Sequence, residues 1–507
     1  MSINASQPVL TGPVQNSALR DRDAFLGLVG VALVLFALSL PLALPGSGLS
    51  RTGFAVAVFA FALVLTRLSL PKDELVARRY ISFGNAFLVF ASITYGLSLF
   101  GPDLPAVARV APGVVERTNL IGIPIAIAAF FVGYRMSDRK YGLGQLGSFV
   151  APPSSKLAPP AFLGSVYLFT VLVRMFSLAT GRLGFQRAVS TSGQVDSIGQ
   201  IANDIGGFGN AIIALALLGY GTVRVKGYRY IPMVGIPIEL AFGALSGRKG
   251  FFLLAGLSAV LMLVYIGRLR FRTLVLGGVA AFLFIFPVID NFRDLLGSER
   301  STESVEATQF VQLLGDATGT AVTQWFSSPG EMLGDTRDRS LERLRDVDRY
   351  ALAVETHRTE PFESFETVPV NAAVRSVPRA VWPGKPVIRY GLDVSRTYYQ
   401  LPTQVVTATS LSIAGDGYRY GGYPSLVVLM LFFGWVIRRW DIAFDHTKSV
   451  WLLAAFVPLF DIVKLAEHAR VLPSAIRTTL ILAVMMRLLL RRPATESKVG
   501  QASRKPA

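Results

Sequence analysis

Long apolar stretches separated by short polar segments dominate this chain. A transmembrane helix needs about 20 mostly apolar residues to cross a hydrocarbon core of roughly 30 Å. Several stretches are short or are interrupted by Gly or Pro. The pattern predicts an all-α polytopic membrane protein with about 12 transmembrane helices. The expected spans are 24–44, 53–66, 81–100, 119–135, 160–180, 205–223, 231–246, 250–267, 273–289, 422–438, 449–466 and 473–490.

One segment, residues 290–421, is far too long to be an ordinary connection between spans. Its aromatic residues argue against disorder, so we predict a loop domain of helices and irregular segments. The rest of the chain divides into tails at 1–23 and 491–507 and membrane domains at 24–289 (about nine spans) and 422–490 (about three spans). The first apolar stretch lacks a small-x-small cleavage site, so we expect a retained span and not a signal peptide.

The distribution of Lys and Arg among the short loops predicts the orientation, because cytoplasmic loops carry the excess. With a cytoplasmic N-terminus, the inner segments hold 25 basic residues and the outer short loops hold 10. Both termini are therefore expected in the cytoplasm, and the loop 290–421 is expected outside. That loop has 14 basic and 18 acidic residues, so any anion site in it depends on local placement.

Composition supports this class and excludes several others. The chain has 507 residues, 52% hydrophobic and 16% charged, with a mean hydropathy of +0.48. Its net charge of +17 does not indicate nucleic acid as a partner, because the basic residues mostly flank apolar stretches. The absence of Cys excludes disulfides, thiol nucleophiles and Cys-ligated zinc, and three His residues make a His-built metal site unexpected.

Residues 338–357 of the long loop predict an amphipathic helix. Its polar face interleaves arginines with acidic residues, which has two interpretations. The arginines form ion pairs on a solvated face, or one or two of them clamp an anionic group, since a guanidinium matches phosphate oxygens bidentately. His357 ends this segment and is a candidate general base, although an exposed histidine at a helix end is also common. Glu355, Glu360 and Asp416 are the alternatives.

Residues 368–386 contain four prolines, which exclude a long regular helix. A short helical piece at 372–377 is still expected on the membrane surface. Arg375, Arg379 and Lys385 would then lie on a stiff track, with Trp382 as an interfacial anchor. Binding of lipid headgroups is the alternative role for these basic residues.

Three other places bring charge to the expected outer side of the membrane. The Gly-Asp-Gly run within 412–424 predicts a turn that places Asp416 and Arg419 just before the tenth span. The hairpin SGRKG, Ser246–Gly250, holds Arg248 and Lys249 between two spans, either as an anion site or as an ordinary polar turn. Arg293 follows the ninth span.

Two charged residues fall inside expected spans: Arg174 in the outer half of the fifth span and Glu239 near the middle of the seventh. Charge is costly in lipid and usually faces a cavity or a partner, so both residues are candidates for a functional role. Asp461 and Lys464, three residues apart in the eleventh span, are also candidates, with mutual pairing as the alternative.

The loop sequences resemble a known family. The pattern R-x-x-P-R-x-x-W-P-x-K-P from Arg375 to Pro386, and the Ser/Thr-rich stretch that ends in GDGYRYGGYP before a span, are similar to bacterial O-antigen and exopolysaccharide repeat-unit polymerases. The SGRKG hairpin resembles the short outer hairpin of that family in the same relative position. The resemblance covers residues 240–440 best, and the first 230 residues only by hydropathy.

This resemblance implies a glycosyltransferase of the bacterial cytoplasmic (inner) membrane that joins polyprenyl-pyrophosphate-linked oligosaccharides at the outer leaflet into O-antigen, capsule or exopolysaccharide. Such a reaction needs cations for the pyrophosphate leaving group and a base for the attacking hydroxyl. The expected catalytic residues are Arg248, Arg375, Arg379 and His357. The expected substrate-binding residues are Lys249, Arg293, Arg174, Lys385, Trp382, Asp416 and Arg419.

No Asp-x-Asp lies in an outer loop near a span, so we expect a mechanism led by arginines, without a metal or another cofactor. The expected partners are the lipid-linked oligosaccharides, membrane lipids, and a flippase and chain-length regulator of the same pathway. Three alternatives stay open: an O-antigen ligase, a flippase or other transporter of lipid-linked sugars, and a non-enzymatic scaffold. Internal repeats, which would favour a transporter, are not evident.

Overall fold

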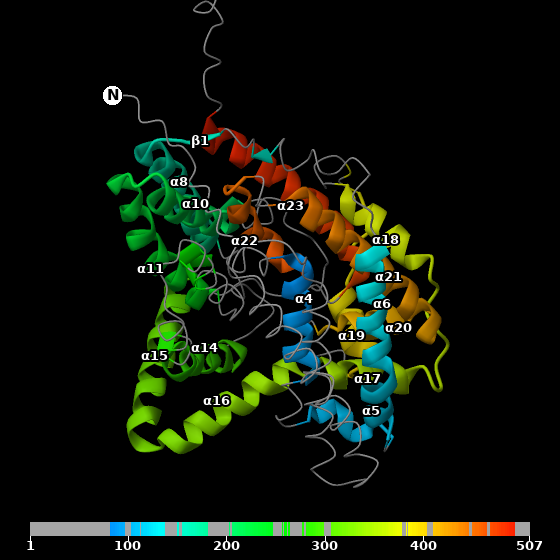
Figure 1. Ribbon diagram of the computed structural model, residues 1–507. Coiled ribbons are helices and arrows are strands. Elements are labelled where there is room, and N and C mark those ends of the chain that lie inside the picture. Colours follow the sequence, from blue (N-terminus) through cyan, green and yellow to red (C-terminus); the bar gives the residue numbers. More distant parts are fainter. Residues whose placement is uncertain are drawn as a thin grey trace, which may run out of the picture.

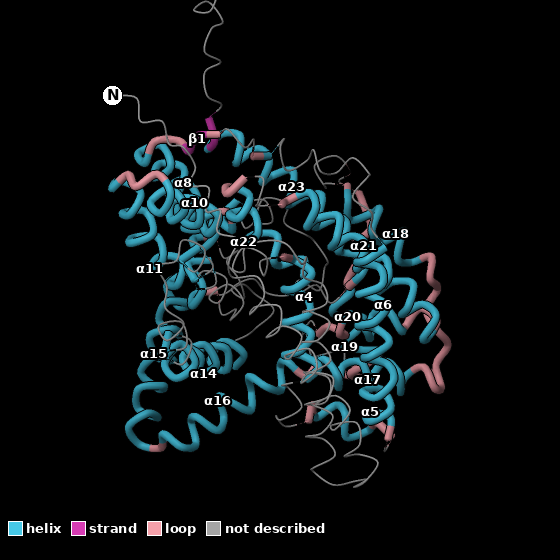
Figure 2. The backbone as a smooth tube through the Cα atoms, viewed as in Figure 1, coloured by secondary structure: helices cyan, strands magenta, loops and turns pink. Residues whose placement is uncertain are grey.

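In the computed structural model, the described part of the chain is mostly helical (Figures 1 and 2). Among the residues described, the strands are β1 (Lys156–Leu157) and β2 (Leu490–Arg491), which form one antiparallel pair. The structure describes residues 82–96, 103–111, 113–136, 150–151, 155–180, 202, 205–246, short pieces between 256 and 277, 280–298, 306–377, 382, 384–402, 409–445, 449–463 and 467–491.

Within the described ranges, three helices are long and apolar enough to cross a membrane by length and composition. They are α8 (Pro160–Ala179), the helix Ile205–Thr222 that includes α10 (Gly209–Thr222), and α23 (His468–Leu489). A stripe of large apolar side chains stays exposed along α23, one every four residues: Leu472, Ile476, Leu480, Val484 and Leu488. Long exposed apolar stripes of this kind suit contact with lipid. The fold is consistent with an all-α membrane protein.

The other expected spans are covered only in part. Helix α21 (Gly422–Ala443) covers the tenth span. Shorter helices lie in four more: α4 (Phe83–Ala91) with the π-helical turn η1 (Ser92–Gly96), α6 (Ile123–Met136), α11 (Tyr230–Leu245) and α22 (Leu452–Val463). Spans 24–44 and 53–66, and most of 250–267, lie outside the described residues, whereas the span 273–289 is described at 276, 277 and 280–289. The number of twelve spans therefore stays a prediction.

Helix α21 lies directly against α6, and two glycines make this close approach. A Cβ on Gly133 of α6 would lie 2.0 Å from the carbonyl oxygen of Leu431, and a Cβ on Gly434 of α21 would lie 2.0 Å from that of Phe130. Helix α4 packs beside this pair, and the rings of Phe87 and Phe130 meet with centroids 4.1 Å apart. The largest hydrophobic core is centred here and extends to α10, α22 and α23.

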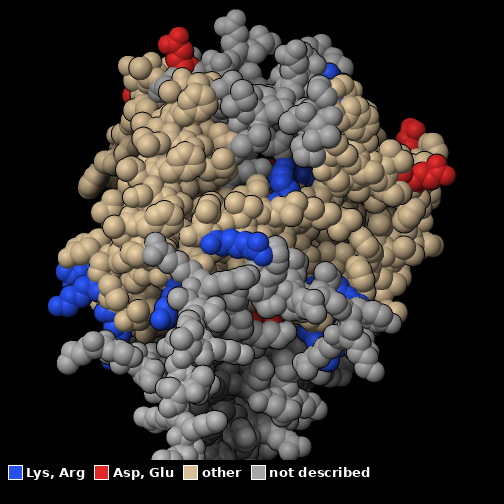
Figure 3. Space-filling model, turned by 90° about the horizontal axis from the view of Figure 1, so that it is seen from above, with Lys and Arg blue, Asp and Glu red and all other residues tan. Residues whose placement is uncertain are grey.

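Segments expected on the cytoplasmic side meet at one end of the molecule. Lys156 pairs with Arg491 in the β1–β2 register. The hydroxyl of Tyr228, in η5 (Lys226–Arg229), donates to the carbonyl of Ala158 at 2.8 Å. The indole N–H of Trp451 donates to the carbonyl of Ser155 at 3.0 Å. Seen from above, this end carries several basic patches, while acidic side chains are visible mainly near its edges (Figure 3).

Segments expected on the opposite side also meet one another. The outer connection contains η3 (Pro105–Arg109), α5 (Val114–Arg117) and η4 (Thr118–Gly122) and packs against α17 (Asp346–Thr356). The backbone N–H of Leu104 donates to Asp348 at 2.9 Å, and Asp103 pairs with Arg345 at 2.6 Å. Tertiary contacts therefore tie the long loop to the hairpin that follows the third expected span.

The arginine-rich segment is not one helix, contrary to the prediction for 338–357. Helix α16 (Pro329–Leu344) ends and α17 begins on either side of Arg345, whose ψ of 71° is not helical. The Arg345 side chain is buried and bonds Asp348 at 2.7 Å, so the bend places its guanidinium between two carboxylates. Arg349 pairs with Asp346 at 3.0 Å, and Arg339 pairs with Asp294. The ion-pair interpretation fits these arginines better than the anion clamp.

Helix α16 joins the helices around α14 (Phe286–Ser298) and α15 (Ala307–Ser327) to those around α17 (Figure 1). The turn η6 (Ala281–Ile285) leads into α14. Helix α18 (Thr367–Ser376) is longer than the piece expected at 372–377. It extends because Pro369 falls in its first turn, where a missing N–H costs no helical hydrogen bond. Helix α19 (Tyr390–Thr397) follows.

The Gly-Asp-Gly run is helical, so the predicted turn is wrong. It forms the centre of α20 (Ile413–Tyr418). The Ser412 hydroxyl accepts a hydrogen bond from the N–H of Gly415 at 3.1 Å and so caps the helix. Residues 415–417 are buried against neighbouring helices, and this packing outweighs the low helix propensity of glycine.

Candidate functional site

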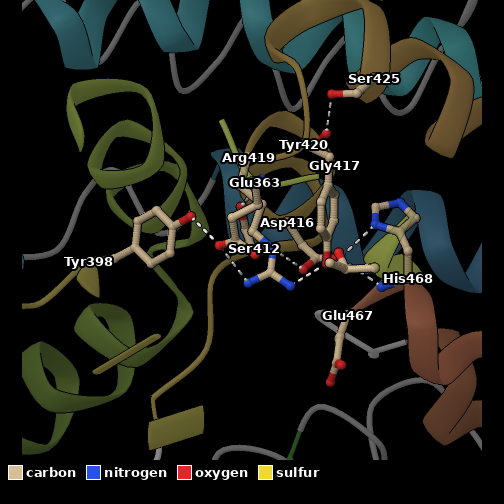
Figure 4. Close-up of polar contacts among 12 residues, drawn as sticks. Glu363, Tyr398, Ser412, Asp416, Gly417, Arg419, Tyr420, Ser425, Glu467 and His468 are labelled. Atoms are coloured by element: carbon tan, nitrogen blue, oxygen red, sulfur yellow. Dashed lines mark hydrogen bonds and ion pairs between the residues drawn. The ribbon is translucent and has the colours of Figure 1, made fainter. Parts of the chain in front are cut away.

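Buried and partly exposed charges gather where the loop helices meet the first residues of α23 (Figure 4). The group comprises Glu363, Arg375, Asp416, Arg419, Glu467 and His468, and we call it the junction cluster. It connects α18 and α20 of the long loop to the last long apolar helix. Burial of charge is costly unless each group is paired, so the partners decide what the cluster can do.

Asp416 is the centre of the junction cluster. Its carboxylate accepts hydrogen bonds from the backbone N–H of His468 at 2.8 Å and from the ring Nδ1 of His468 at 2.9 Å. Arg419 Nε lies 3.1 Å from its other oxygen. Burial raises the pKa of Asp416, but Arg419 and His468 outweigh burial and lower it below its ordinary value. Asp416 is therefore a fixed negative charge.

Arg419 bridges the acids of the long loop. It pairs with Glu363 at 3.2 Å as well as with Asp416, and its guanidinium lies over the rings of Tyr390 and Tyr420 with centroids at 5.0 Å and 4.5 Å. Burial lowers the pKa of Arg419, but the carboxylate of Asp416 and the other nearby acidic groups raise it overall. Arg419 is thus permanently charged and is held in place by ion pairs and aromatic rings, which indicates a structural role.

His357, the predicted base, lies at the C-terminal end of α17 and is attached to the junction cluster through Tyr398. Tyr398 donates to Glu363 at 2.9 Å, and His357 Nε2 lies 2.9 Å from the Tyr398 hydroxyl. The imidazole also stacks on Phe362 with centroids 4.9 Å apart. The stacking and the hydrogen bond hold the ring in place. The Nε2 atom of His357 is therefore already engaged by Tyr398, the residue that links it to the cluster.

Arg375 forms the second half of the cluster with Glu467. Arg375 Nη1 donates to one carboxylate oxygen at 3.1 Å, and Nη2 lies 2.9 Å from the other oxygen without forming a hydrogen bond to it. Arg375 is 20% exposed and Glu467 only 3%. Burial raises the pKa of Glu467 to about 7, although Arg375 opposes this rise. Burial also lowers the pKa of Arg375, partly offset by Glu467. Glu467 is thus an acid of the cluster whose pKa lies near neutral pH.

Lys385 contacts the C-terminal end of the helix that carries Arg375. The ammonium of Lys385 donates to the carbonyls of Val377 at 2.7 Å and Val374 at 3.4 Å, which are at the C-terminal end of α18. A cation there offsets the negative end of the helix dipole. Trp382 is 42% exposed, as expected of an interfacial anchor. Arg248, Lys249 and Arg379 lie outside the described residues.

The two remaining candidates lie elsewhere in the fold. Arg293 is on α14, which packs mainly against α15. Arg174 on α8 pairs with Glu239 on α11, and the Tyr167 hydroxyl lies 3.4 Å from the same carboxylate. The guanidinium also lies 5.5 Å from the ring centroid of Phe242. The two charges found separately in the sequence are thus one buried ion pair.

We expect Arg174→Met to destabilise the protein strongly, because Glu239 would stay buried without its cation. Loss of one partner of a buried pair costs about 3–5 kcal/mol. Thermal unfolding of the purified full-length protein in detergent should show a clear drop in Tm. The double variant R174M/E239M should recover most of it; an R174M protein as stable as the wild type would contradict a structural role for the pair.

Sequence reasoning missed Glu363, Tyr398, Glu467 and His468. Glu467 and His468 are adjacent in the short connection between the last two expected spans, on the expected outer side. An acid next to one of three histidines in such a connection was the available signal. Glu363 and Tyr398 gave no signal, because only the folded loop brings them to Arg419.

No protein-family model matches this chain, and neither a curated protein nor a solved structure matches it. Among the residues described, no group of three His, Asp or Glu side chains is placed to hold a metal ion. The arrangement of the junction cluster suits two kinds of chemistry. An arginine fork can bind phosphate oxygens, and a carboxyl that titrates near pH 7 can move a proton.

Proposed function

We propose that this protein is a multi-pass glycosyltransferase of the bacterial cytoplasmic membrane that polymerises polyprenyl-pyrophosphate-linked oligosaccharide repeat units at the outer leaflet. The observation that carries the proposal is the position of Arg375. It opens the R-x-x-P-R-x-x-W-P-x-K-P pattern, and its fork is partly exposed beside the start of α23. An arginine fork at that level can take the pyrophosphate of a lipid carrier.

The arrangement of the loops supports the orientation in this proposal. Three segments that are expected on the cytoplasmic side meet at one end of the molecule, namely residues 155–158, 226–229 and 490–491. Segments 103–104 and 345–348, both expected outside, meet each other. If the chain crosses the membrane as the Lys and Arg distribution predicts, the junction cluster belongs to the outer surface. A growing chain and a new lipid-linked unit would meet there.

In this reaction the donor chain leaves its lipid pyrophosphate and joins a hydroxyl of the next lipid-linked unit. Arg375 would stabilise the negative charge that develops on the departing pyrophosphate. Arg419 and Asp416 would keep α20 and α23 in register, so that Arg375 holds its position. Arg248, Arg379 and Lys249 are proposed as further phosphate contacts, with Trp382 at the lipid interface.

Deletion of the gene and electrophoresis of the surface polysaccharide test the proposal. We expect single repeat units or none on the deletion strain. Long chains that accumulate on the polyprenyl carrier would indicate a ligase instead, and repeat units retained on the inner leaflet would indicate a transporter. Long surface chains identical to those of the parent strain would contradict all three activities.

Complementation with Arg375→Ala should leave the deletion phenotype, with polymer reduced by roughly 10²-fold or more, because one electrostatic contact to a leaving group is worth this much. Arg358→Ala is the matched control: Arg358 is exposed and pairs only with Glu355 at 3.1 Å among the described residues. It should restore normal chain lengths at equal protein level. Normal chains with both variants would remove Arg375 from the mechanism.

A further inference from the structure

Asp416 and Glu467 are two buried acids in the same cluster, and their surroundings differ sharply. Asp416 receives two hydrogen bonds from His468 and the charge of Arg419. The Glu467 carboxylate bonds Arg375, and Arg470 and Arg419 act on it through their charge alone. The pKa of Asp416 is lowered, whereas burial raises that of Glu467 to about 7. When the surroundings of two neighbouring acids shift their pKa values in opposite directions, the acids commonly take different roles. One stays ionised as a fixed charge, and the other carries a proton.

The pairing of Glu467 with Arg375 is open to exchange. Arg375 is the more exposed member, at 20%, so an anion can approach its fork without unfolding the cluster. A phosphate group presents oxygens in the same bidentate spacing as a carboxylate and carries more charge. A pyrophosphate that binds Arg375 therefore competes directly with Glu467, and the carboxylate loses the cation that most strongly opposes its protonation.

Resting on the function proposed above, we infer that Glu467 accepts the proton of the attacking sugar hydroxyl, and that its ion pair with Arg375 holds it inactive until the donor pyrophosphate draws Arg375 away. The base is thus exposed only when a donor is bound.

The step balances without any further reactant. The acceptor hydroxyl gives its proton to the Glu467 carboxylate, and its oxygen forms a bond to the anomeric carbon of the donor sugar. The bond from that carbon to the pyrophosphate oxygen breaks, and its electron pair stays on the pyrophosphate, where Arg375 meets the charge. Glu467 then releases the proton to water as Arg375 returns.

The other acidic and basic groups nearby suit this role less well. Asp416 is fully buried and already bonded to His468 and Arg419. His468 is buried as well, with its ring against Gly417 and Phe433. His357 is bonded to Tyr398, which separates it from Arg419 and Asp416.

The test uses the full-length protein reconstituted in liposomes, with lipid-linked repeat units extracted from the deletion strain as substrate. We expect Glu467→Gln to lower the polymerisation rate by roughly 10²- to 10⁴-fold, the usual contribution of a general base. Inhibition by inorganic pyrophosphate should persist, because Arg375 is still present and is no longer neutralised. Glu366→Gln, at an exposed acid of the same loop, is the control and should leave the rate unchanged.

The pH profile separates a base from a merely structural residue. The wild-type kcat/KM should rise with pH and level off above about pH 7, because kcat/KM reports the free enzyme, in which Arg375 still pairs with Glu467 and only the ionised carboxylate can serve as the base. The E467Q variant should lose this rise. Arg375→Met, which keeps the carboxyl but removes its cation, should move the rise to higher pH and covers the case in which E467Q does not fold.

Two results would overturn the inference while the proposed function stands. One is an E467Q rate within threefold of the wild type with the same pH profile. The other is an R375M profile that does not move. A wild-type protein that makes no polymer from these units would instead count against the proposed function itself, whatever Glu467 does.

Discussion

Arg419→Met is expected to destabilise the junction between the long loop and α23 by about 3–5 kcal/mol, the usual result of removing one partner of a buried ion pair. Asp416 would keep its contacts with His468 but lose its nearest guanidinium, and Glu363 would lose its pair. The aromatic rings that cover the guanidinium would then enclose an apolar chain of different shape. Thermal unfolding of the full-length protein in detergent measures the loss as a lower Tm.

Arg358→Met is the control for this variant. Arg358 is 55% exposed and pairs with Glu355 at 3.1 Å, so its loss should cost at most about 1 kcal/mol. The double variant R419M/D416N should recover part of the loss, because the uncompensated charge is removed with its partner. Equal Tm values for R419M and R358M would show that the cluster does not hold the junction.

The sign of the pH effect at Asp416 follows from its lowered pKa. A carboxyl whose folded pKa lies below the unfolded value contributes stability at every pH above the unfolded value, about 4, and loses it as pH falls through the folded value. The destabilisation by R419M should therefore be full at pH 7 and shrink only in strong acid. Glu467 has the opposite shift, so its ionisation disfavours the folded state as pH rises towards 7.

Local patterns in the sequence predicted what depends on neighbours along the chain. Helix α8 and the helix Ile205–Thr222 begin and end close to the expected limits of 160–180 and 205–223. A continuous apolar run of this length has few stable structures other than a membrane-spanning helix. The break at Arg345 was not predictable, because its cause is Asp103, more than 200 residues earlier. The turn predicted for the Gly-Asp-Gly run was wrong for a similar reason, because burial against other parts of the fold outweighed the low helix propensity of glycine.

The candidate site divides in the same way. Asp416 and Arg419 stood out in the sequence because they lie just before an expected span, and Arg375 stood out because it opens the proline-rich basic stretch. Their partners did not, since Glu467 is 92 residues from Arg375 and Glu363 is 56 residues from Arg419. A single sequence shows which charges need a partner, but the fold decides the partner. The pairing also changed the interpretation of Arg375, from a cation that waits for a phosphate to one that a carboxylate already holds.

The contact between α6 and α21 leads to a second large effect, independent of the charges. Gly434→Leu should lower stability by more than about 3 kcal/mol, towards the upper end for overpacked interiors. The new Cβ would meet the backbone oxygen of Phe130 at 2.0 Å, and backbone cannot move aside as a side chain can. The two helices would have to separate, which would also loosen the contact between Phe87 of α4 and Phe130 of α6.

Gly164→Leu on α8 is the matched control, because a Cβ at that position meets nothing within 4 Å. It should be neutral or stabilising by up to about 1 kcal/mol, since leucine favours a helix over glycine. Gly133→Leu should behave like Gly434→Leu, because its Cβ would meet Leu431 from the other side. The two variants together should not rescue each other, as each adds volume to the same contact. Comparable Tm values for G434L and G164L would mean that α6 and α21 do not approach at this distance.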